Sequence, residues 1–218
     1  ALSFDLQRQF AGNAAHELRT PLAMMQTKLE LFAEEHSNIN TETAELVQFQ
    51  MAQVDRLNAL VRTLLEMSNL QSVSRSDEIE LSPLVDEILT DLTTLAEQKN
   101  ITLHQNCEDV HMTGSDTLIY RLLFNLIENA IKYNHPGGSV TVSIRNENHQ
   151  ALLHVADTGC GIPEAYRESI FQPFFRVDKS RSRQMGGVGL GLALVKEIAV
   201  LHGGNVCVES SSEDGTTF

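Results

Sequence analysis

The stretch NAAHELRTPLA, from Asn13 to Ala23, places a histidine, a glutamate, an arginine and a proline inside a segment with a helical pattern. Apolar residues recur along this segment in steps of three and four, which is the spacing of one helix face in a bundle. The series consists of Phe10, Ala14, Leu18, Leu22, Met25, Leu29 and Phe32. The pattern predicts a long amphipathic helix with this series as its buried seam.

A second helical series follows the polar stretch EEHSNINTETAE. Asn40 or Thr41 is placed to cap this helix, which we expect to end near Leu70. Its apolar seam consists of Val54, Leu57, Leu60, Val61, Leu64 and Met67. Two antiparallel helices with one apolar stripe each do not form a sufficient core, so we expect two copies of this hairpin to build a four-helix bundle in a homodimer.

His16 lies two residues from its neighbours in the first seam, which corresponds to about 200° around a helix. We therefore expect His16 to point away from the seam and to be exposed. Glu17 is adjacent and able to polarise an imidazole, Thr20 lies one turn further along the same face, and Pro21 should bend the helix. A neutral, exposed imidazole is a nucleophile at neutral pH. The alternative at this point is an ordinary surface histidine.

The polar stretch QSVSRSDE, residues 71–78, marks a boundary that divides the chain into domains at 1–72 and 73–218. Helices are expected beyond it at 83–99, 116–134 (capped by Asp116), 164–170 and 190–202. Strands are expected at 101–107, 109–115 and 205–210, with a hairpin of two strands over 139–157. This order favours an α+β chain, in which a two-layer α/β sandwich follows the helical hairpin.

The 218 residues include 16 basic and 29 acidic side chains, and the resulting net charge of −13 argues against a nucleic-acid partner. The sequence has no run of roughly 18 apolar residues that would predict a membrane span. Cys107, Cys160 and Cys207 lack the spacing of a metal site, which favours free thiols in a reducing compartment. The chain begins at Ala1 and ends on what resembles the start of a strand, so we expect both ends to be cuts in a longer protein.

The chain lacks the GxxxxGK[ST] phosphate loop, but the stretch NLIENAIKY carries polar residues on a single helix face. Amide and carboxylate oxygens are hard ligands for Mg²⁺, so Asn125, Glu128 and Asn129 are candidate metal ligands. Lys132 would contact a phosphate, and Tyr133 would offer its ring to a purine. A solvated polar face is the alternative.

Three further segments favour a nucleotide site. In DTGCGIP, Asp157 is able to accept a hydrogen bond from an exocyclic amine such as that of adenine, and Gly159 and Gly161 allow close backbone approach. FQPFFR, residues 171–176, precedes a polar, basic segment that is typical of a lid over phosphates. GGVGLGLALV, residues 186–195, opens an apolar helix whose backbone amides favour phosphate. Each segment alone also fits an ordinary turn or core.

HELRTPL resembles the H-box of sensor histidine kinases, and the four later segments are similar, in their order, to the N, G1, F and G2 boxes of that family's ATP-binding fold. The resemblance implies a phosphotransfer hairpin followed by a catalytic domain of the Bergerat (GHKL) type, with ATP and Mg²⁺ as cofactors. It implies His16 as the phosphoacceptor, Glu17 as the activating acid and Thr20 as the residue that orients water during dephosphorylation of the partner. It assigns nucleotide contacts to Asn125, Asn129, Lys132, Tyr133, Asp157, Gly159, Gly161, Phe171, Phe174, Gly187, Gly189 and Gly191. Arg176, at the start of the basic segment, is a further candidate contact for phosphate.

The same resemblance implies a protein-histidine kinase that phosphorylates itself with ATP and passes the phosphoryl group to an aspartate of a response regulator, with phosphatase activity toward that regulator. It also implies the cytoplasmic portion of a membrane sensor, attached to the membrane only through segments outside this chain. Three alternatives are a degenerate kinase that sequesters a regulator, an ATPase of the topoisomerase or chaperone type, and a sensor that acts mainly as a phosphatase. The H-box argues against the ATPase.

Overall fold

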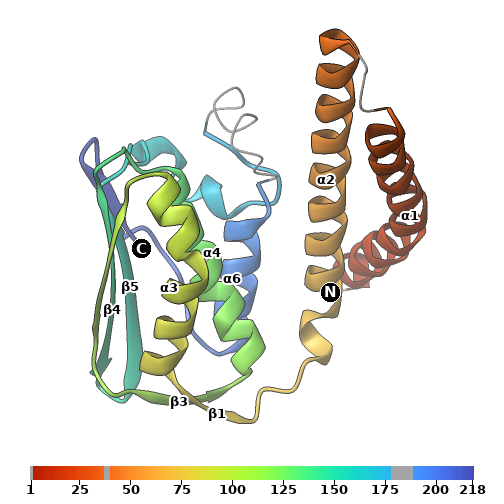
Figure 1. The fold of residues 1–218 in the computed structure, drawn as a ribbon. Helices are drawn as coiled ribbons and strands as arrows, with labels where there is room; N and C mark the ends of the chain where they lie inside the picture. Colours follow the sequence, from red (N-terminus) through yellow and green to blue (C-terminus); the bar gives the residue numbers. More distant parts are fainter. Residues whose placement is uncertain (1, 37–39, 178–188) are drawn as a thin grey trace. The chain divides into compact units, whose positions relative to one another are not determined.

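The computed structural model describes residues 2–36, 40–177 and 189–218, and only the backbone of residues 2–11, 13 and 16. The chain forms two compact units, one of which ends at Ser72 while the other begins at Val73. The first unit holds two long helices, α1 (Leu2–Glu35) and α2 (Thr41–Asn69), and a 3-10 turn at Leu70–Ser72 (Figure 1). The predicted helical hairpin is therefore confirmed.

Asn40 caps α2, because its side-chain oxygen accepts a hydrogen bond of 2.8 Å from the backbone amide of Thr43. The two helices pack through a small cluster of buried residues, which comprises Ala15, Leu22, Val61 and Leu65. Of the predicted seam, Leu22 is buried in this single hairpin, whereas Leu18 and Met25 are 48% and 55% exposed; Ala15, which the prediction leaves out, is fully buried. Ala15 and Leu22 face α2, where they pack with Val61 and Leu65. Leu18 and Met25 lie beside this contact on the surface of α1.

Pro21 stands inside α1, and the helix continues across it. Because proline has no backbone N–H, the carbonyl of Glu17 receives no helical hydrogen bond from position 21. Figure 1 shows that α1 curves along its length, as proline inside a helix predicts.

The second unit is a sheet covered by helices. Its helices are α3 (Leu81–Gln98), α4 (Asp116–Lys132) and α6 (Gly191–Leu201), and its main strands are β2 (Thr102–Cys107), β4 (Ser139–Glu147), β5 (Gln150–Asp157), β6 (Ser210–Ser212) and β7 (Gly215–Thr217). The strand order is β2-β4-β5-β7-β6, with β2 parallel to β4 and every other pair antiparallel. A separate ladder joins β1 (Asp77–Glu80) to β3 (His111–Gly114). The three helices lie on the same side of the sheet, which confirms the two-layer sandwich (Figure 1).

The core of this unit lies between the sheet and its helices. Val140, Val142 and Ile144 alternate along β4 and are fully buried. Burying such a side chain stabilises a fold by about 1.5–3 kcal/mol. The intervening residues of β4, such as Thr141, occupy the opposite, more polar face of the strand. The helices add buried residues at helical spacing, including Val85, Ile88 and Leu92 in α3.

Three local predictions in this unit are wrong. Ser115, not Asp116, caps α4, since its backbone is extended and its hydroxyl accepts from the amide of Leu118 at 3.4 Å. The predicted helix at 164–170 is a pair of 3-10 turns, because the segment is short and Pro173 prevents its continuation as a helix. The predicted strand at 205–210 is irregular up to Glu209, and β6 begins only where residues find a partner in β7.

The imidazole of His202 connects the end of α6 to the start of α4 through hydrogen bonds. Its Nε2 accepts a hydrogen bond of 3.0 Å from the amide of Ser115, and its Nδ1 donates to the carbonyl of Ile198 at 2.8 Å. A Cβ at Gly114 would lie 2.7 Å from the ring of His202, so glycine makes this approach feasible. The contact fixes α4 relative to α6. Within the described ranges, no helix is long and apolar enough to cross a membrane.

Candidate functional site

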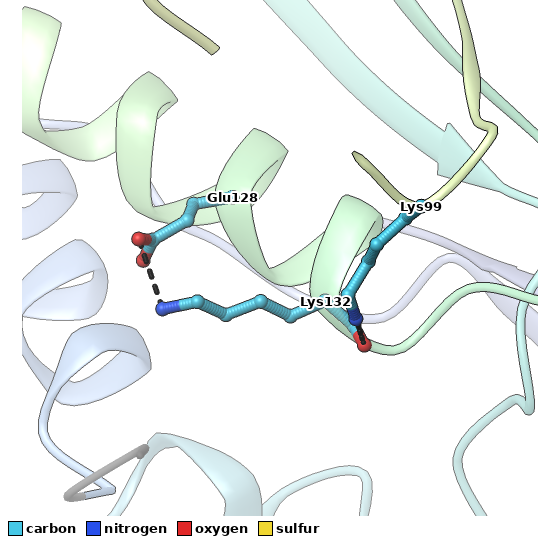
Figure 2. Close-up of polar contacts among 3 residues, drawn as sticks. All are labelled: Lys99, Glu128 and Lys132. Atoms are coloured by element: carbon cyan, nitrogen blue, oxygen red, sulfur yellow. Dashed lines mark hydrogen bonds and ion pairs between the residues drawn. The ribbon is translucent and has the colours of Figure 1, made fainter. Parts of the chain in front are cut away.

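One face of α4 carries polar side chains that are neither fully buried nor fully exposed. Its members are Asn125, Glu128, Asn129 and Lys132, and Tyr133 follows directly. The ammonium of Lys132 pairs with the carboxylate of Glu128 at 2.9 Å, and both side chains project from the same face of the helix (Figure 2). The side-chain amide of Asn125 donates to the carbonyl of Arg121 at 2.7 Å, which leaves its oxygen directed elsewhere.

The N-terminal end of α6 lies against this polar face. A Cβ at Gly191, the first residue of α6, would lie 2.7 Å from the side-chain oxygen of Asn125 and 4.0 Å from the side-chain nitrogen of Asn129. The first amides of a helix have no partner inside the helix and favour negative charge. The structure thus brings an anion-binding helix end beside the amides of α4.

Asp157 ends β5 and presents a half-buried carboxyl group. Its Oδ1 accepts hydrogen bonds from the amides of Gly159 at 2.8 Å and Thr216 at 3.3 Å. Burial raises the pKa of Asp157, and these two amides and the nearby His135 offset part of that rise. No residue that the structure describes donates to its second oxygen, Oδ2, which is available for an external donor.

The turn after β5 depends on glycine at two positions. A Cβ at Gly159 would lie 2.5 Å from the backbone oxygen of Tyr133, so the turn passes directly over the end of α4. Gly161 has a φ of +66°, and a Cβ there would overlap the carbonyl oxygen of Ser212. The amide of Cys160 also donates to the Tyr133 oxygen at 3.2 Å. Asp157 and Tyr133 are therefore held side by side.

The segment around Phe174 contacts the residues that directly precede α6. The amide of Phe174 donates to the carbonyl of Gly189 at 2.8 Å, and Gly189 has a φ of +80°. Arg176 is half-buried, and among the described residues its Nη2 has no hydrogen-bond partner. Phe171 is buried; its ring contacts Phe218 with ring centroids 6.2 Å apart, and the ammonium of Lys196 lies 5.7 Å from its centroid.

The contacts above bring together most of the predicted nucleotide set: Asn125, Asn129, Lys132, Tyr133, Asp157, Gly159, Gly189 and Gly191. Gly161 and Phe174 border it, whereas Gly187 lies outside the described residues. His16, Glu17 and Thr20 belong to the first unit. Glu17 and Thr20 are exposed on α1, and the side chain of His16 lies outside the described part of the structure. Sequence reasoning missed Lys99, whose ammonium donates to the backbone oxygen of Lys132 at 2.6 Å (Figure 2).

The arrangement suits a ligand that has an amine at one end and negative charge at the other. Asp157 offers an acceptor, while Lys132 and the start of α6 offer positive charge. In the described ranges, no group of three or more His, Cys, Asp or Glu side chains could hold a metal on its own. The oxygens of Asn125, Asn129 and Glu128 suit a hard cation such as Mg²⁺, but only together with oxygens from an anionic ligand.

Two families of known proteins match this chain. The family described as His Kinase A (phospho-acceptor) domain matches residues 6–73. The family described as histidine kinase-, DNA gyrase B- and HSP90-like ATPase matches residues 114–218. The sensor histidine kinase RppB of Synechocystis is 36% identical over 221 residues, which cover 99% of this chain and 49% of RppB.

Solved structures share the fold. Full-length ShkA, solved in complex with AMPPNP, has a TM-score of 0.75 and 22% identity over 96% of this chain and 44% of its own. The histidine kinase ThkA, solved with the response regulator protein TrrA, has a TM-score of 0.66 and 23% identity over 96% of this chain and 59% of its own.

The two matches define a protein in which a hairpin of the phosphoacceptor family precedes a domain of the ATPase family. The chain belongs to the two-component sensor histidine kinase family. It spans about half the length of RppB, one of the curated relatives that it matches.

Replacing Gly161 by alanine should strongly destabilise the second unit, because the new Cβ adds an overlap with the Ser212 carbonyl to the cost of a positive φ. Gly203→Ala is the matched control, since Gly203 has a φ of +73° and open space around it. The φ cost alone is about 1–2 kcal/mol. Thermal unfolding should show a clearly larger loss for Gly161→Ala than for Gly203→Ala, and equal losses would contradict the close approach.

Proposed function

We propose that this chain phosphorylates itself on His16 with ATP and then passes the phosphoryl group to an aspartate of a response regulator. The observation that carries the proposal is the combination of two features in one chain. His16 lies on α1 inside the match to the phosphoacceptor family, and Asp157, Lys132 and the start of α6 converge inside the match to the ATPase family. In this proposal residues 1–72 are the dimerisation and phosphotransfer domain, and residues 73–218 are the catalytic ATP-binding domain.

In the proposed complex, the free Oδ2 of Asp157 accepts a hydrogen bond from the exocyclic amine of adenine. Tyr133 packs beside the base, and Gly159 and Gly161 let the backbone approach it. Lys132 and the N-terminal amides of α6 neutralise the phosphates. The remaining proposed contacts come from Asn125, Asn129, Phe171, Phe174, Arg176, Gly187, Gly189 and Gly191. The complex of ShkA with AMPPNP supports a nucleotide of this kind.

Mg²⁺ is proposed at Asn125, Asn129 and Glu128, whose oxygens would complete a shell begun by phosphate oxygens. When bound, the ion would supply positive charge that offsets the charge of the triphosphate. The chain's own contribution is to hold these three donors on one helix face, next to Lys132.

Phosphoryl transfer needs a neutral imidazole at His16. A ring nitrogen lone pair forms the new N–P bond as the bond from the γ-phosphorus to the bridging oxygen breaks, and ADP leaves with that electron pair. Glu17, adjacent on α1 and exposed, accepts the hydrogen bond or the proton of the other ring nitrogen, which stabilises the positive charge that develops.

A response regulator is the proposed acceptor, as the complex of ThkA with TrrA supports. The carboxylate of the regulator's aspartate attacks the phosphorus of phosphohistidine, and His16 returns to its neutral form. Thr20, exposed one turn beyond His16 on α1, is proposed to orient the water that hydrolyses the aspartyl phosphate.

The hairpin is proposed to pair with a second copy of itself. Large apolar side chains remain exposed on it, including Leu18, Met25, Leu46 and Leu57, which are between 47% and 58% exposed. Contiguous exposed apolar surface indicates an interface. A four-helix bundle of two hairpins would cover these residues.

Leu57→Glu should convert a dimer into a monomer, because it places a charge in the proposed interface. Ala59→Glu is the matched control, since Ala59 is exposed about half a turn around α2 and outside the apolar stripe. Light scattering should give twice the chain mass for the parent and for Ala59→Glu, and the single mass for Leu57→Glu. A parent protein with the molar mass of one chain would contradict the dimer proposal.

His16→Gln should abolish protein-bound phosphate after incubation with γ-labelled ATP and Mg²⁺, because glutamine has no nucleophilic ring nitrogen. The label on the parent should be labile in acid and stable in alkali, as a phosphoramidate is. His36→Gln, at the other end of the first hairpin helix, is the control and should keep the label. Equal labelling of the parent and His16→Gln would refute the phosphoacceptor assignment.

Asp157→Asn should weaken ATP binding about 10- to 100-fold, since hydrogen bonds to a charged group contribute about 1.5–3 kcal/mol. Asparagine can still accept from the amides of Gly159 and Thr216, but its amino group would then face the adenine amine. The fold should not lose stability at neutral pH, because the raised pKa of Asp157 means that its ionised form opposes folding there. Calorimetry and thermal unfolding measure the two effects.

Asp214→Asn, at an exposed carboxylate, is the control and should leave ATP affinity unchanged. The parent should lose affinity for ATP as the pH falls through the raised pKa of Asp157, above the range of an ordinary aspartate. Asp157→Asn should lack this dependence. If both proteins show the same pH dependence, Asp157 does not recognise the base.

A further inference from the structure

The last turn of α4 and the two residues after it are held by side chains from separate segments. This stretch, Lys132 to Asn134, contains the proposed phosphate contact and the proposed base contact, so its position decides where both point. Within the chain of α4, the amide of Tyr133 donates to the carbonyl of Asn129 at 3.0 Å, and the amide of Asn134 donates to the carbonyl of Ile131 at 3.4 Å. The other anchors come from outside α4.

Lys99, in the turn after α3, provides the first outside anchor. Its ammonium donates to the backbone oxygen of Lys132 at 2.6 Å, at the end of α4 where carbonyls lack helical partners (Figure 2). The contact uses the backbone of Lys132, so the ammonium of Lys132 stays free to pair with Glu128. Lys99 therefore fixes the position of the Lys132 backbone and does not interact with the Lys132 ammonium through this hydrogen bond.

Lys99 is an unfavourable choice for stability alone. Partial burial lowers the pKa of Lys99, and the neighbouring charge of Lys132 lowers it further. The charge of Lys132 therefore disfavours the charged form of Lys99. A neutral side chain of similar length would avoid this unfavourable interaction, so the contact is better explained by the geometry that it imposes.

Thr158 provides the second outside anchor, on the base side. Its hydroxyl accepts from the amide of Ser139 at 2.8 Å and donates to the side-chain oxygen of Asn134 at 3.1 Å. The side-chain nitrogen of Asn134 donates in turn to the carbonyl of Ser139 at 2.9 Å. A Cβ at Gly138 would overlap the Asn134 oxygen, so glycine leaves room for this network. Thr158 directly follows Asp157 in sequence.

We propose that Lys99 and Thr158 are positioning residues that hold the end of α4 between them and so set the spacing between Asp157 and Lys132 for a bound nucleotide. This inference rests on the proposed ATP site. Lys99 aligns the phosphate side, and Thr158 aligns the base side. Neither residue needs to contact the nucleotide.

The test uses Lys99→Met and Thr158→Val, which keep side-chain size but remove the donor. Lys99→Arg and Thr158→Ser keep a donor and serve as rescue variants, and Lys28→Met, at an exposed lysine of α1, is the surface control. Binding of AMPPNP and of adenosine to the full chain is measured by calorimetry, and thermal unfolding is recorded without ligand.

Each loss of a hydrogen bond should weaken AMPPNP binding about three- to tenfold. Lys99→Met should weaken AMPPNP but not adenosine, because adenosine has no phosphate, and its unfolding midpoint should stay level or rise. Thr158→Val should weaken both ligands. Lys99→Arg and Thr158→Ser should restore affinity, and Lys28→Met should match the parent.

Unchanged AMPPNP affinity in both Lys99→Met and Thr158→Val would overturn the inference while the parent still binds. The inference would also be overturned if the variants lose AMPPNP affinity only in proportion to a fall in their unfolding midpoints. Such a result would mean that Lys99 and Thr158 stabilise the fold and do not position the site. A parent that binds neither ligand would instead refute the proposed nucleotide site, and the inference with it.

Discussion

The placement of α4 is the constraint on which the second unit depends. Both ends of a helix expose backbone groups that have no partner inside the helix, and in α4 distant side chains satisfy groups at both ends. His202 accepts the amide of Ser115 at the start, and Lys99 donates to the oxygen of Lys132 at the end. These two contacts connect α4 to α6 and to the turn after α3. The polar face of α4 is therefore held in place by contacts that lie outside that face.

Charged groups in the second unit lower the stability of the protein without ligand, and they favour the binding of a ligand of complementary charge. The carboxyl of Asp157 is half-buried with one oxygen free, so its ionised form lacks the solvation that it would have in water. Lys99 and Lys132 bring two positive charges into one partly buried region, where Glu128 neutralises only one of them directly. A ligand that offers an amine to Asp157 and negative charge to Lys132 removes both costs. Such preorganised charges are typical of binding sites and uncommon in cores built for stability alone.

The sequence predicts what depends on local pattern. Helical spacing identifies α1 and α2, Asn40 identifies the start of α2, and the ordered boxes identify the region around Asp157. Contacts between distant residues are not encoded locally: Lys99 and Lys132 are 33 residues apart, and Ser115 and His202 are 87 apart. The periodicity of α1 likewise gives an apolar face but not which part of it α2 covers, so Leu22 is buried while Leu18 and Met25 are exposed in the single hairpin. Residues 205–209 have a strand-like composition but no ladder partner among the described residues, and composition does not reveal this.

The division of the chain separates the two chemical tasks. The described residues proposed for the nucleotide lie in the unit that begins at Val73, whereas His16, Glu17 and Thr20 lie in the unit that ends at Ser72. Nucleotide affinity should then be a property of one unit, governed by the anchors of α4, and should not depend on the chemistry of α1. The proposed transfer to His16 needs residues of both units. An input that acts on the curved, proline-containing α1 could thus change phosphorylation without changing the affinity for ATP.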